Sequence, residues 1–577
     1  MPTTLRFLLV ATLTVGACVA LPVQDAAADT AAAKARLQEI AAAVNLTVDG
    51  WAWTLDGQAW EDYRLGRGLT ASRVGLRTRI PCREFVAAVP VLGTPTILKL
   101  KLYARGLVDV TVRQDDRVVQ VIRLDGGGDQ GAEVVKEVFL NDPPPITGST
   151  IDLEAVNSGR RPPRGEFWPP RRNPLPETGL VFAVRGAEMD YLEARPMVAA
   201  LRDWVDSLQT AERLIWPELV RYTFTRKPFP IEDRRGVPAE RLAQLGDAYA
   251  RAVQALDLDA VKRGSRDRLE ASLKQSLAET AELRRYAQEF KVHLIGNAHI
   301  DIAWLWRMAE TKEVARNTYA TVLKNMDEYP ELVYAQSQAL TYRWMEERDP
   351  QLFRQIAQRI ADGRWEVVGG TWVEPDCNLI SGESWVRQLL FGKRYFKEKF
   401  GVDVTIGWNP DSFGYNWNMP QLYRKSGLDV FITQKIWWND TTVFPHFVFW
   451  WEGPDGTRLL TYFPPEGYTS RVDLAENADA ITKYQATTGW QKSLILYGLG
   501  DHGGGPNREI LDRVRRYGRL PVAPQYVHAK AGDFLKQIPG DLGDRIPVWR
   551  DELYLEYHRG TFTSQAQVKR NNRRCEA

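Results

Sequence analysis

Hydrophobic and polar positions follow different periods along the chain, and the first stretch alternates strictly. Between residues 51 and 184, short segments such as TILKLKLY and RVVQVIRL place apolar residues at every second position. Turn-forming stretches such as DGGGDQG and NDPPPITGST separate these segments. Alternation of this kind is typical of strands that bury one face, so we expect an antiparallel β domain, a β-sandwich, over residues 45–189.

A helical period replaces the alternation from residue 190 to residue 289. Leucine and alanine recur there at three- and four-residue spacing, as in RLEASLKQSLAETAELRRYAQEF. This spacing places the apolar residues on one face of a helix. We therefore expect a helical linker region over residues 190–289.

Strands alternate with amphipathic helices from residue 290 to residue 577. The candidate strands are KVHLIGN, LVYAQSQ, WEVVGGTWV, VTIGWNP, VFITQKI, SLILYGLGD and ELYLEYH. Helical patterns over residues 339–363 and 382–401 lie between some of them. The alternation predicts an α/β fold with a parallel sheet, either open or closed as a seven-stranded barrel-like domain.

The N-terminus has the layout of an export signal. Arg6 precedes an apolar run of about a dozen residues that ends in small residues, which is typical of a secretory signal over residues 1–28. Cleavage is expected after the Ala26-Ala27-Ala28 run; alternatively, the segment VGAC resembles a lipoprotein box with a lipid anchor at Cys18. Either reading predicts a periplasmic, extracellular or envelope-anchored protein. No later segment is long and apolar enough to span a bilayer.

The amino-acid composition excludes few kinds of binding partner. The 577 residues are 44% hydrophobic and 26% charged, and the net charge of +2 gives no indication of a nucleic-acid partner. The 20 Trp and 21 Tyr residues suit both core packing and carbohydrate binding. Beyond the signal only Cys82, Cys377 and Cys575 remain, which excludes a disulfide framework and a cysteine-ligated zinc site.

Titratable side chains gather where the candidate strands end. They are His299 and Asp301 after KVHLIGN, Glu374 and Asp376 after WEVVGGTWV, Asp411 in NPDSFG, Lys435 in VFITQK, Asp501 and His502 in GDHGGG, and His558 in ELYLEYH. Parallel α/β folds place their active sites at the carboxyl ends of strands. The pattern therefore predicts an active site at this end of the sheet.

His299 and Asp301 are candidate metal ligands. Positions i and i+2 share one side of an extended chain, so an imidazole and a carboxylate at these positions can bind the same cation. Mixed nitrogen and oxygen ligands suit Zn²⁺, with Mn²⁺ or Co²⁺ as alternatives. A buried hydrogen bond between the two side chains is the competing interpretation, because H-x-D is a short and common motif.

Several longer blocks carry a family resemblance. HIDIAWLW, ETKEVARN, GGTWVEPDCNLISGES, GWNPDSFGYNWNMPQ and YLEYHRGTFTSQAQVKRNNRRCE resemble, in this order, the α-mannosidases of glycoside hydrolase family 38. The similarity is greatest to the branch with cytosolic and bacterial members and covers residues 290–577. It implies a metal-dependent glycosidase that hydrolyses terminal α-linked mannose from glycans with retention of configuration.

The resemblance also implies one metal ion per active site and a role for individual residues. His299, Asp301 and Asp411 correspond to zinc ligands, and Asp411 is also the nucleophile of the family. Asp501 matches the general acid/base best. The substrate-binding positions are Trp304, Phe413, Lys435, Asp376 and His558. For Asp376 and its neighbour Glu374, capping of the helix that begins near Gly382 remains an equal alternative.

The fourth zinc ligand of the family is a histidine downstream of the R-R-C-E block, and the sequence ends at Ala577. We therefore expect a chain truncated at its C-terminal end, with His558 as an alternative fourth ligand.

Two other functions remain open. A polysaccharide deacetylase-like metal hydrolase also places His and Asp at strand ends but uses a metal-bound water as nucleophile. A non-catalytic fragment that binds mannose or another glycan would show saturable binding without turnover. Release of mannose, release of acetate, or binding alone separates the three.

Overall fold

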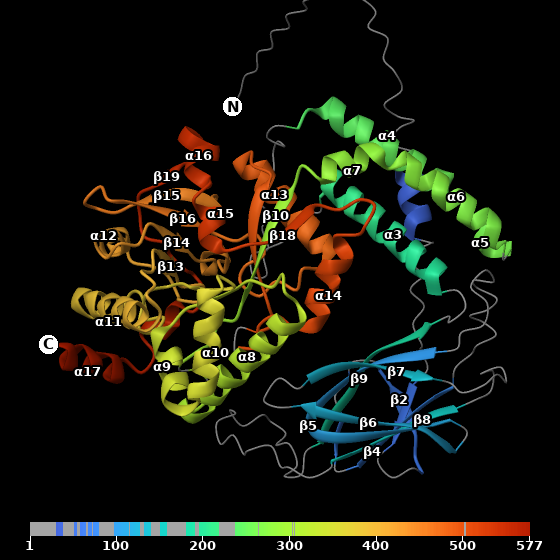
Figure 1. Ribbon diagram of the computed structural model, residues 1–577, viewed down its shortest axis with the longest axis horizontal. Coiled ribbons are helices and arrows are strands. Elements are labelled where there is room, and N and C mark those ends of the chain that lie inside the picture. Colours follow the sequence, from blue (N-terminus) through green and yellow to red (C-terminus); the bar gives the residue numbers. More distant parts are fainter. Residues whose placement is uncertain are drawn as a thin grey trace, which may run out of the picture.

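The computed structural model of the chain is shown in Figure 1. It describes residues 30–38, 51–54, 58–64, 67, 69–71, 73–79, 97–114, 116–126, 132–139, 150–157, 180–190, 195–217, 237–263, 265–302, 304, 306–500 and 503–577. The predicted export signal with Cys18, and also Cys82, Asp501 and His502, lie outside these described residues.

The first part of the chain forms antiparallel strands, as the alternation predicts. They are β1 (Trp51–Thr54), β2 (Glu61–Tyr63), β3 (Leu69–Ala71), β4 (Arg73–Arg79), β5 (Ile97–Gln114), β6 (Arg117–Gly126), β7 (Ala132–Phe139), β8 (Thr150–Asn157) and β9 (Leu180–Asp190). The long strand β5 joins two sets of partners, because residues 97–105 pair with β7 and β9 and residues 106–114 pair with β6 and β8. The pairing therefore gives one connected nine-stranded sheet and does not establish two separate sheets of a sandwich.

Alternate side chains of β5 form the core of this part. The fully buried ones are Leu100, Leu102, Ala104, Val108, Val110 and Val112. They pack with Trp51, Leu76 and Phe182 in a cluster whose described members all lie between residues 51 and 184. The antiparallel strands thus have a hydrophobic core of their own.

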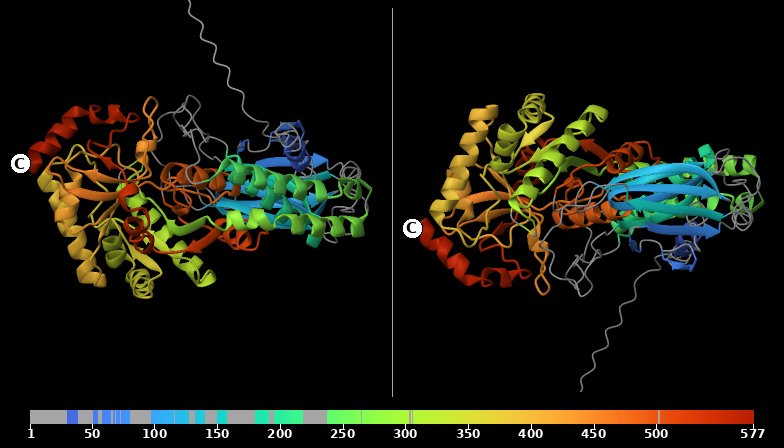
Figure 2. Two further views of the ribbon diagram at one scale, coloured as in Figure 1. Left: turned by 90° about the horizontal axis from the view of Figure 1, so that it is seen from above. Right: turned by 90° about the horizontal axis from the view of Figure 1, so that it is seen from below.

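Five helices follow, as the helical period predicts: α3 (Arg195–Ile215), α4 (Ala239–Ala255), α5 (Leu258–Arg263), α6 (Arg266–Glu279) and α7 (Ala281–Ala287). Their apolar faces bury Trp204 and Leu208 in the same cluster as Ile481 and Val514 of the following α/β part. The α/β part and the antiparallel strands lie at opposite ends of an elongated molecule, and α3 packs beside α13 and α14 (Figures 1 and 2). These helices are therefore part of a shared core rather than a linker.

The α/β part contains two five-stranded sheets. Its strands are β10 (Lys291–Asn297), β11 (Tyr334–Gln336), β12 (Trp365–Val367), β13 (Ile406–Trp408), β14 (Val430–Ile432), β15 (Val448–Glu452), β16 (Arg458–Tyr462), β17 (Lys492–Tyr497), β18 (Gln525–His528) and β19 (Val548–Trp549). One sheet has the order β12-β11-β10-β17, with β18 also paired to β10, and the other has the order β13-β14-β16-β15-β19. All of these pairs are parallel except β15 with β16.

A few hydrogen bonds link the two sheets at both sides. The Gly369 N–H, just after β12, donates to the Ile406 carbonyl of β13 at 2.8 Å. On the other side, the Tyr462 hydroxyl of β16 donates to the Leu494 carbonyl of β17 at 3.0 Å and accepts from the Leu494 N–H at 2.8 Å. The mixed α/β class is confirmed, whereas the strand ladders alone do not close a seven-stranded barrel.

Helices cover the two sheets: α8 (Met308–Glu328), α9 (Ala339–Arg348), α10 (Pro350–Ala361), α11 (Gly382–Phe400), α12 (Met419–Lys425), α13 (Leu474–Thr488), α14 (Arg508–Tyr517), α15 (Ala531–Leu535) and α16 (Ile538–Leu542). The helix at the C-terminal end, α17 (Ala566–Glu576), has no buried residue. The single helix expected over residues 339–363 is two helices. Pro350 disfavours helical geometry at Asp349, which instead caps α10 by accepting a hydrogen bond from the Leu352 N–H at 3.2 Å.

The strand expected at ELYLEYH is wrong. Residues 552–558 form only an isolated bridge, between Leu553 and Tyr415. Leu553 and Leu555 are buried at alternate positions, which mimics a strand, but Glu556 accepts hydrogen bonds from the backbone N–H groups of residues 440–442 instead. A strand that was not expected, β16, instead pairs in parallel with β14 and forms a hairpin with β15. Within the described part of the chain, no helix combines the length and apolar character needed to cross a bilayer.

Candidate active site

The segments after β10, β12, β13 and β14 bring the predicted residues together. β10 is buried along almost its whole length, and the chain leaves it through His299 and Asp301. Asp411 follows β13, and Lys435 begins a short 3₁₀ helix (Lys435–Trp437) after β14. Because neighbouring parallel strands end at the same edge, side chains far apart in sequence meet there.

Three of these side chains surround one point. The Nε2 atom of His299 lies 3.0 Å from Oδ1 of Asp301 and 3.6 Å from Oδ2 of Asp411. One ligand atom from each residue lies within 4.8 Å of the other two. Ligands of one Zn²⁺ at about 2.1 Å from the ion are roughly 3–4 Å apart, so this donor set fits a divalent cation after small side-chain adjustments. The two carboxylates also match the charge of such an ion.

A third acid, Glu374, faces the other edge of the His299 ring. The Oε2 atom of Glu374 lies 3.3 Å from His299 Nδ1, and the side chains of Glu374 and His299 are only 6% and 4% exposed. Burial acts to lower the pKa of His299, but the charge of Glu374, the hydrogen bond to Asp301 and the charge of Asp411 outweigh it, so this pKa is raised well above its usual value. The pocket of three acids therefore favours positive charge at this position.

Lys435 is buried and paired with Asp411. Its side chain is only 3% exposed, its Nζ atom forms an ion pair with Oδ1 of Asp411, and the same atom lies 3.3 Å from the centre of the Trp438 ring. A lysine at a strand end is usually exposed, and this one is not. The two oxygens of Asp411 are therefore divided, one toward Lys435 and the other toward His299.

Aromatic rings lie near Lys435. The ring of Phe413 is 5.6 Å from Lys435 Nζ, and its centre is 4.8 Å from that of His558. His558 also lies 5.8 Å from Trp438. Burial, followed by the charge of Lys435, lowers the pKa of His558. The structure thus places His558 among the aromatic residues. It is not part of the candidate metal-ligand set of His299, Asp301 and Asp411.

Trp304 is an exposed aromatic residue beside the metal-ligand segment. It is 41% exposed, and its ring packs edge-on against Trp306 with 5.3 Å between centres. The Trp306 indole N–H donates to the Asp301 carbonyl at 3.1 Å. Trp304 is therefore available to a ligand, which a core role would not allow.

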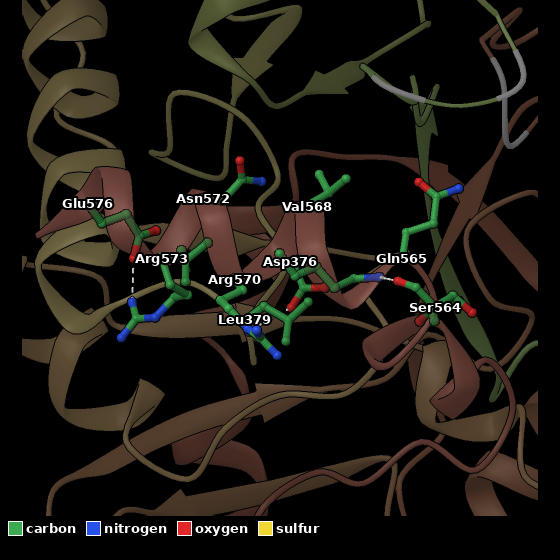
Figure 3. A pocket seen from close by; sticks show the side chains of 12 residues that line it. Asp376, Leu379, Ser564, Gln565, Val568, Arg570, Asn572, Arg573 and Glu576 are labelled. Carbon is green, nitrogen blue, oxygen red and sulfur yellow. Dashed lines mark hydrogen bonds and ion pairs between the residues drawn. The ribbon is translucent and has the colours of Figure 1, made fainter.

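Asp376 caps a turn rather than helix α11. Its Oδ1 atom accepts from the N–H groups of Asn378 and Leu379, both at 2.9 Å, whereas Ser381 caps α11 by accepting from the Ser384 N–H at 3.0 Å. Asp376 also lines a cavity of about 590 Å³ between its own segment and α17 (Figure 3). The expected helix cap is wrong for Asp376, and its role in substrate binding stays a prediction.

The GDHGGG loop returns to the His299 segment. Gly503, the first described residue after Asp501 and His502, donates its N–H to the His299 carbonyl at 2.7 Å. Leu499 and Gly505 pair with each other on either side of the loop. Gly503 has a φ of +93°, and a Cβ atom there would lie 2.6 Å from Val314, so this close approach requires glycine.

Sequence reasoning missed three residues of this site. Glu374 was considered only for helix capping or substrate binding, Trp438 was not singled out, and Gln338 was read as the end of a strand. The signals available were the position of Glu374 at a strand end and the aromatic pair after Lys435. Nothing in the sequence marked Gln338, whose buried side chain joins two of the loops described above.

Comparison with known proteins agrees with this geometry. Residues 289–552 match the model of the glycosyl hydrolases family 38 N-terminal domain. Alpha-mannosidase G of Dictyostelium discoideum is 41% identical over 287 residues, which are 50% of this chain and 26% of that protein. Alpha-mannosidase of Saccharomyces cerevisiae is 36% identical over 378 residues, 62% of this chain and 35% of that protein.

Alpha-mannosidase 2C1 of Homo sapiens is similar as well, with 38% identity over 286 residues, 49% of this chain and 27% of that protein. The chain thus spans between about a quarter and a third of the length of these relatives. The matched region contains all four strand ends that carry His299, Glu374, Asp411 and Lys435. Residues 289–552 are thus similar to the N-terminal domain of the glycosyl hydrolases of family 38.

Proposed function

We propose that this chain carries the catalytic domain of a retaining, metal-dependent α-mannosidase that hydrolyses terminal α-linked mannose from glycans. The observation that supports it most is the division of the Asp411 carboxylate. One oxygen is paired with the buried Lys435, and the other faces His299 and Asp301. A carboxylate fixed at both oxygens is oriented for attack on a bound sugar.

In this proposal Asp411 attacks the anomeric carbon and forms a glycosyl ester, while Asp501 donates its proton to the departing glycosidic oxygen. Asp501 then removes a proton from the water that cleaves the ester, and the two inversions leave the configuration unchanged. The position of Asp501 lies outside the described residues, and the support for its role is the sequence motif and the contact of Gly503 with His299.

His299, Asp301 and Asp411 would hold the divalent cation, Zn²⁺ being the first candidate. When bound, such an ion would bind the neighbouring 2- and 3-hydroxyls of mannose and so orient the ring. Phe413, His558 and Trp438 supply apolar faces for the sugar beside it, and Trp304 supplies an exposed one. In this proposal seven strands, β12, β11, β10 and β17 of one sheet and β13, β14 and β16 of the other, act as one barrel-like ring that carries the site.

Hydrolysis of 4-nitrophenyl α-mannoside by the full chain with Zn²⁺ tests the function. We expect Asp411→Asn to lower the rate by about a thousandfold or more, because a nucleophile has no substitute in this mechanism. Removal of the metal with a chelator should abolish the activity, and added Zn²⁺ should restore it. Proton NMR of the first product should show the α-anomer.

Asp403→Asn is the matched control, since its carboxylate is 67% exposed and pairs with Lys393 away from the site. It should leave the rate unchanged. Retained activity in Asp411→Asn would contradict the role of this residue as nucleophile. Release of acetate from an acetylated glycan, without release of mannose, would instead favour a metal-dependent deacetylase.

The N-terminal pattern is the sole basis for our further proposal that the protein is exported.

A further inference from the structure

The His299 ring has two nitrogen atoms in different surroundings. Nε2 faces Asp301 and Asp411, whereas Nδ1 faces Oε2 of Glu374 at 3.3 Å. His299 Nδ1 and Glu374 Oε2 are both buried, and within the described part of the chain neither has a partner in good hydrogen-bond geometry. Two buried polar atoms that face each other at this distance need only a small rotation to form a hydrogen bond.

Glu374 is held by the strand end next to it. Its Oε1 atom accepts a hydrogen bond from the Ser337 hydroxyl at 2.7 Å. Its backbone N–H donates to the side-chain oxygen of Gln338 at 3.1 Å. Only Oε2 is left to face the imidazole, and the direction of the carboxylate is therefore fixed by the segment after β11.

Gln338 connects this arrangement to the metal-ligand segment itself. Its side-chain amide donates to the carbonyl of Ile300, which lies between His299 and Asp301, at 2.8 Å. Gln338 is 1% exposed and has a φ of +67°, which is uncommon for a residue other than glycine. Strained residues of this kind persist where the surrounding contacts fix them, often at functional sites. One buried amide thus ties the segments after β10, β11 and β12 together.

We propose that Glu374 is the positioning residue for the metal ligand His299. Its carboxylate accepts a hydrogen bond from Nδ1–H, which keeps the proton on Nδ1 and directs the lone pair of Nε2 toward the ion. A neutral imidazole has one N–H, so the hydrogen bond at one nitrogen decides which nitrogen is free to bind a metal. This role rests on the metal site of the proposed function and adds to Asp301 and Asp411 a third acid that binds no metal and touches no sugar.

Three variants separate the hydrogen bond from the bulk of the side chain. Glu374→Ala removes the acceptor. Glu374→Gln keeps one, since its amide oxygen can face Nδ1–H while its NH₂ group donates to the Ser337 hydroxyl. Glu366→Gln is the matched control, because Glu366 is a partly buried acid of β12 whose carboxylate accepts from the Ala531 and Gly532 N–H groups, at 2.7 and 3.0 Å, and not from His299.

The measurement is the dissociation constant for Co²⁺, obtained by competition with a chelator, together with the visible absorption of the bound Co²⁺. We expect Glu374→Ala to weaken binding about 10- to 100-fold, which is the usual effect of losing such a partner, and to change the spectrum. Glu374→Gln should retain most of the affinity, and Glu366→Gln should bind as the wild type does. Melting of the metal-free chains checks that each variant is folded.

The proposal is overturned if Glu374→Ala binds Co²⁺ within about twofold of the wild type with an unchanged spectrum. It is also overturned if Glu374→Gln loses as much affinity as Glu374→Ala, since a hydrogen-bond acceptor would then not be what matters. A wild-type chain that binds no Co²⁺ would instead contradict the metal site of the proposed function, and this role with it.

Discussion

Lys435 carries a charge into a region where its side chain is 3% exposed, and Asp411, 12% exposed, is the acid that compensates it. Removing two charges from water costs several kcal/mol per ion, and their attraction recovers this only while both are present. The Trp438 ring, 3.3 Å from Lys435 Nζ, adds a cation–π contact. The catalytic assignment of Asp411 therefore has a consequence for stability that needs no substrate.

We expect Lys435→Met to lower the free energy of unfolding of the α/β part by about 3 kcal/mol, because Asp411 loses the ammonium group that compensates its largely buried charge. The double variant Lys435→Met with Asp411→Asn should regain part of this loss. Urea unfolding of the metal-free chain, followed by tryptophan fluorescence, measures both. Arg387→Met is the control, since the pair of Arg387 with Glu383 is more than 60% exposed and should contribute less than about 1 kcal/mol. Equal stability of Lys435→Met and the wild type would contradict the argument.

Single residues of the site were predictable where a motif and a strand end coincided, as for His299, Asp301, Asp411 and Lys435. Glu374 stands at a strand end too, but its contact with His299 depends on the path of the chain between β12 and α11. Gly369 and Gly370 have φ values of +85° and +71° and turn the chain there. Such a path is set by tertiary contacts and has no local sequence signal.

At the scale of elements, α11 is held unusually close to the segment that leads to Glu374. A Cβ atom at Gly392, in the middle of α11, would lie 2.4 Å from the Gly370 carbonyl oxygen and 2.4 Å from the Thr371 carbonyl carbon. The backbone N–H of Trp372 also donates to the Gln388 carbonyl of the helix at 2.9 Å. The helix thus contacts the backbone of the loop directly.

Gly392→Ala should therefore destabilise the chain by about 1–3 kcal/mol, although alanine normally stabilises a helix interior. It should also weaken Co²⁺ binding, because the segment from Gly370 to Glu374 must shift. Gly382→Ala, at the start of the same helix, has no atom within 4 Å of the added Cβ and should change little. Differential scanning calorimetry measures the first effect and chelator competition the second. Stabilisation by Gly392→Ala would contradict the close packing.

Elements were predictable where period and boundary signals agreed, as for β10 and α11. The strand prediction for ELYLEYH is wrong because buried residues at alternate positions, Leu553 and Leu555, also occur in irregular segments. The backbone groups of such a segment form hydrogen bonds outside a strand ladder. β15 and β16 were missed because VFWWE and RLLTY carry no alternation of polar residues. Burial on both faces removes the period on which such a prediction depends.

At the scale of the whole molecule, the hydrophobic clusters divide the chain before α3, whereas the change from a helical period to alternating strands and helices divides it near residue 290. Trp204 and Leu208 of α3 share a cluster with the α/β part, and Arg516 of α14 forms ion pairs with Asp203 and Asp206 of α3. The antiparallel strands β1–β9 have a separate cluster. The α/β part therefore depends on the five helices before it and not on the strands before them.

A chain that begins at residue 191 should accordingly fold and bind Co²⁺. We expect a modest loss of stability, because Ala33 and Leu37, in the helical segment over residues 30–38, also pack against this core. A chain that begins at residue 289 should aggregate or melt far lower, since the buried surface of α13 and α14 that faces α3 becomes exposed, and burial contributes about 25 cal/mol per Å² of apolar area. Soluble yield, melting temperature and Co²⁺ affinity of the two chains, compared with the full chain, measure this difference. Stable folding and metal binding by residues 289–577 alone would show that helices α3–α7 are a linker after all.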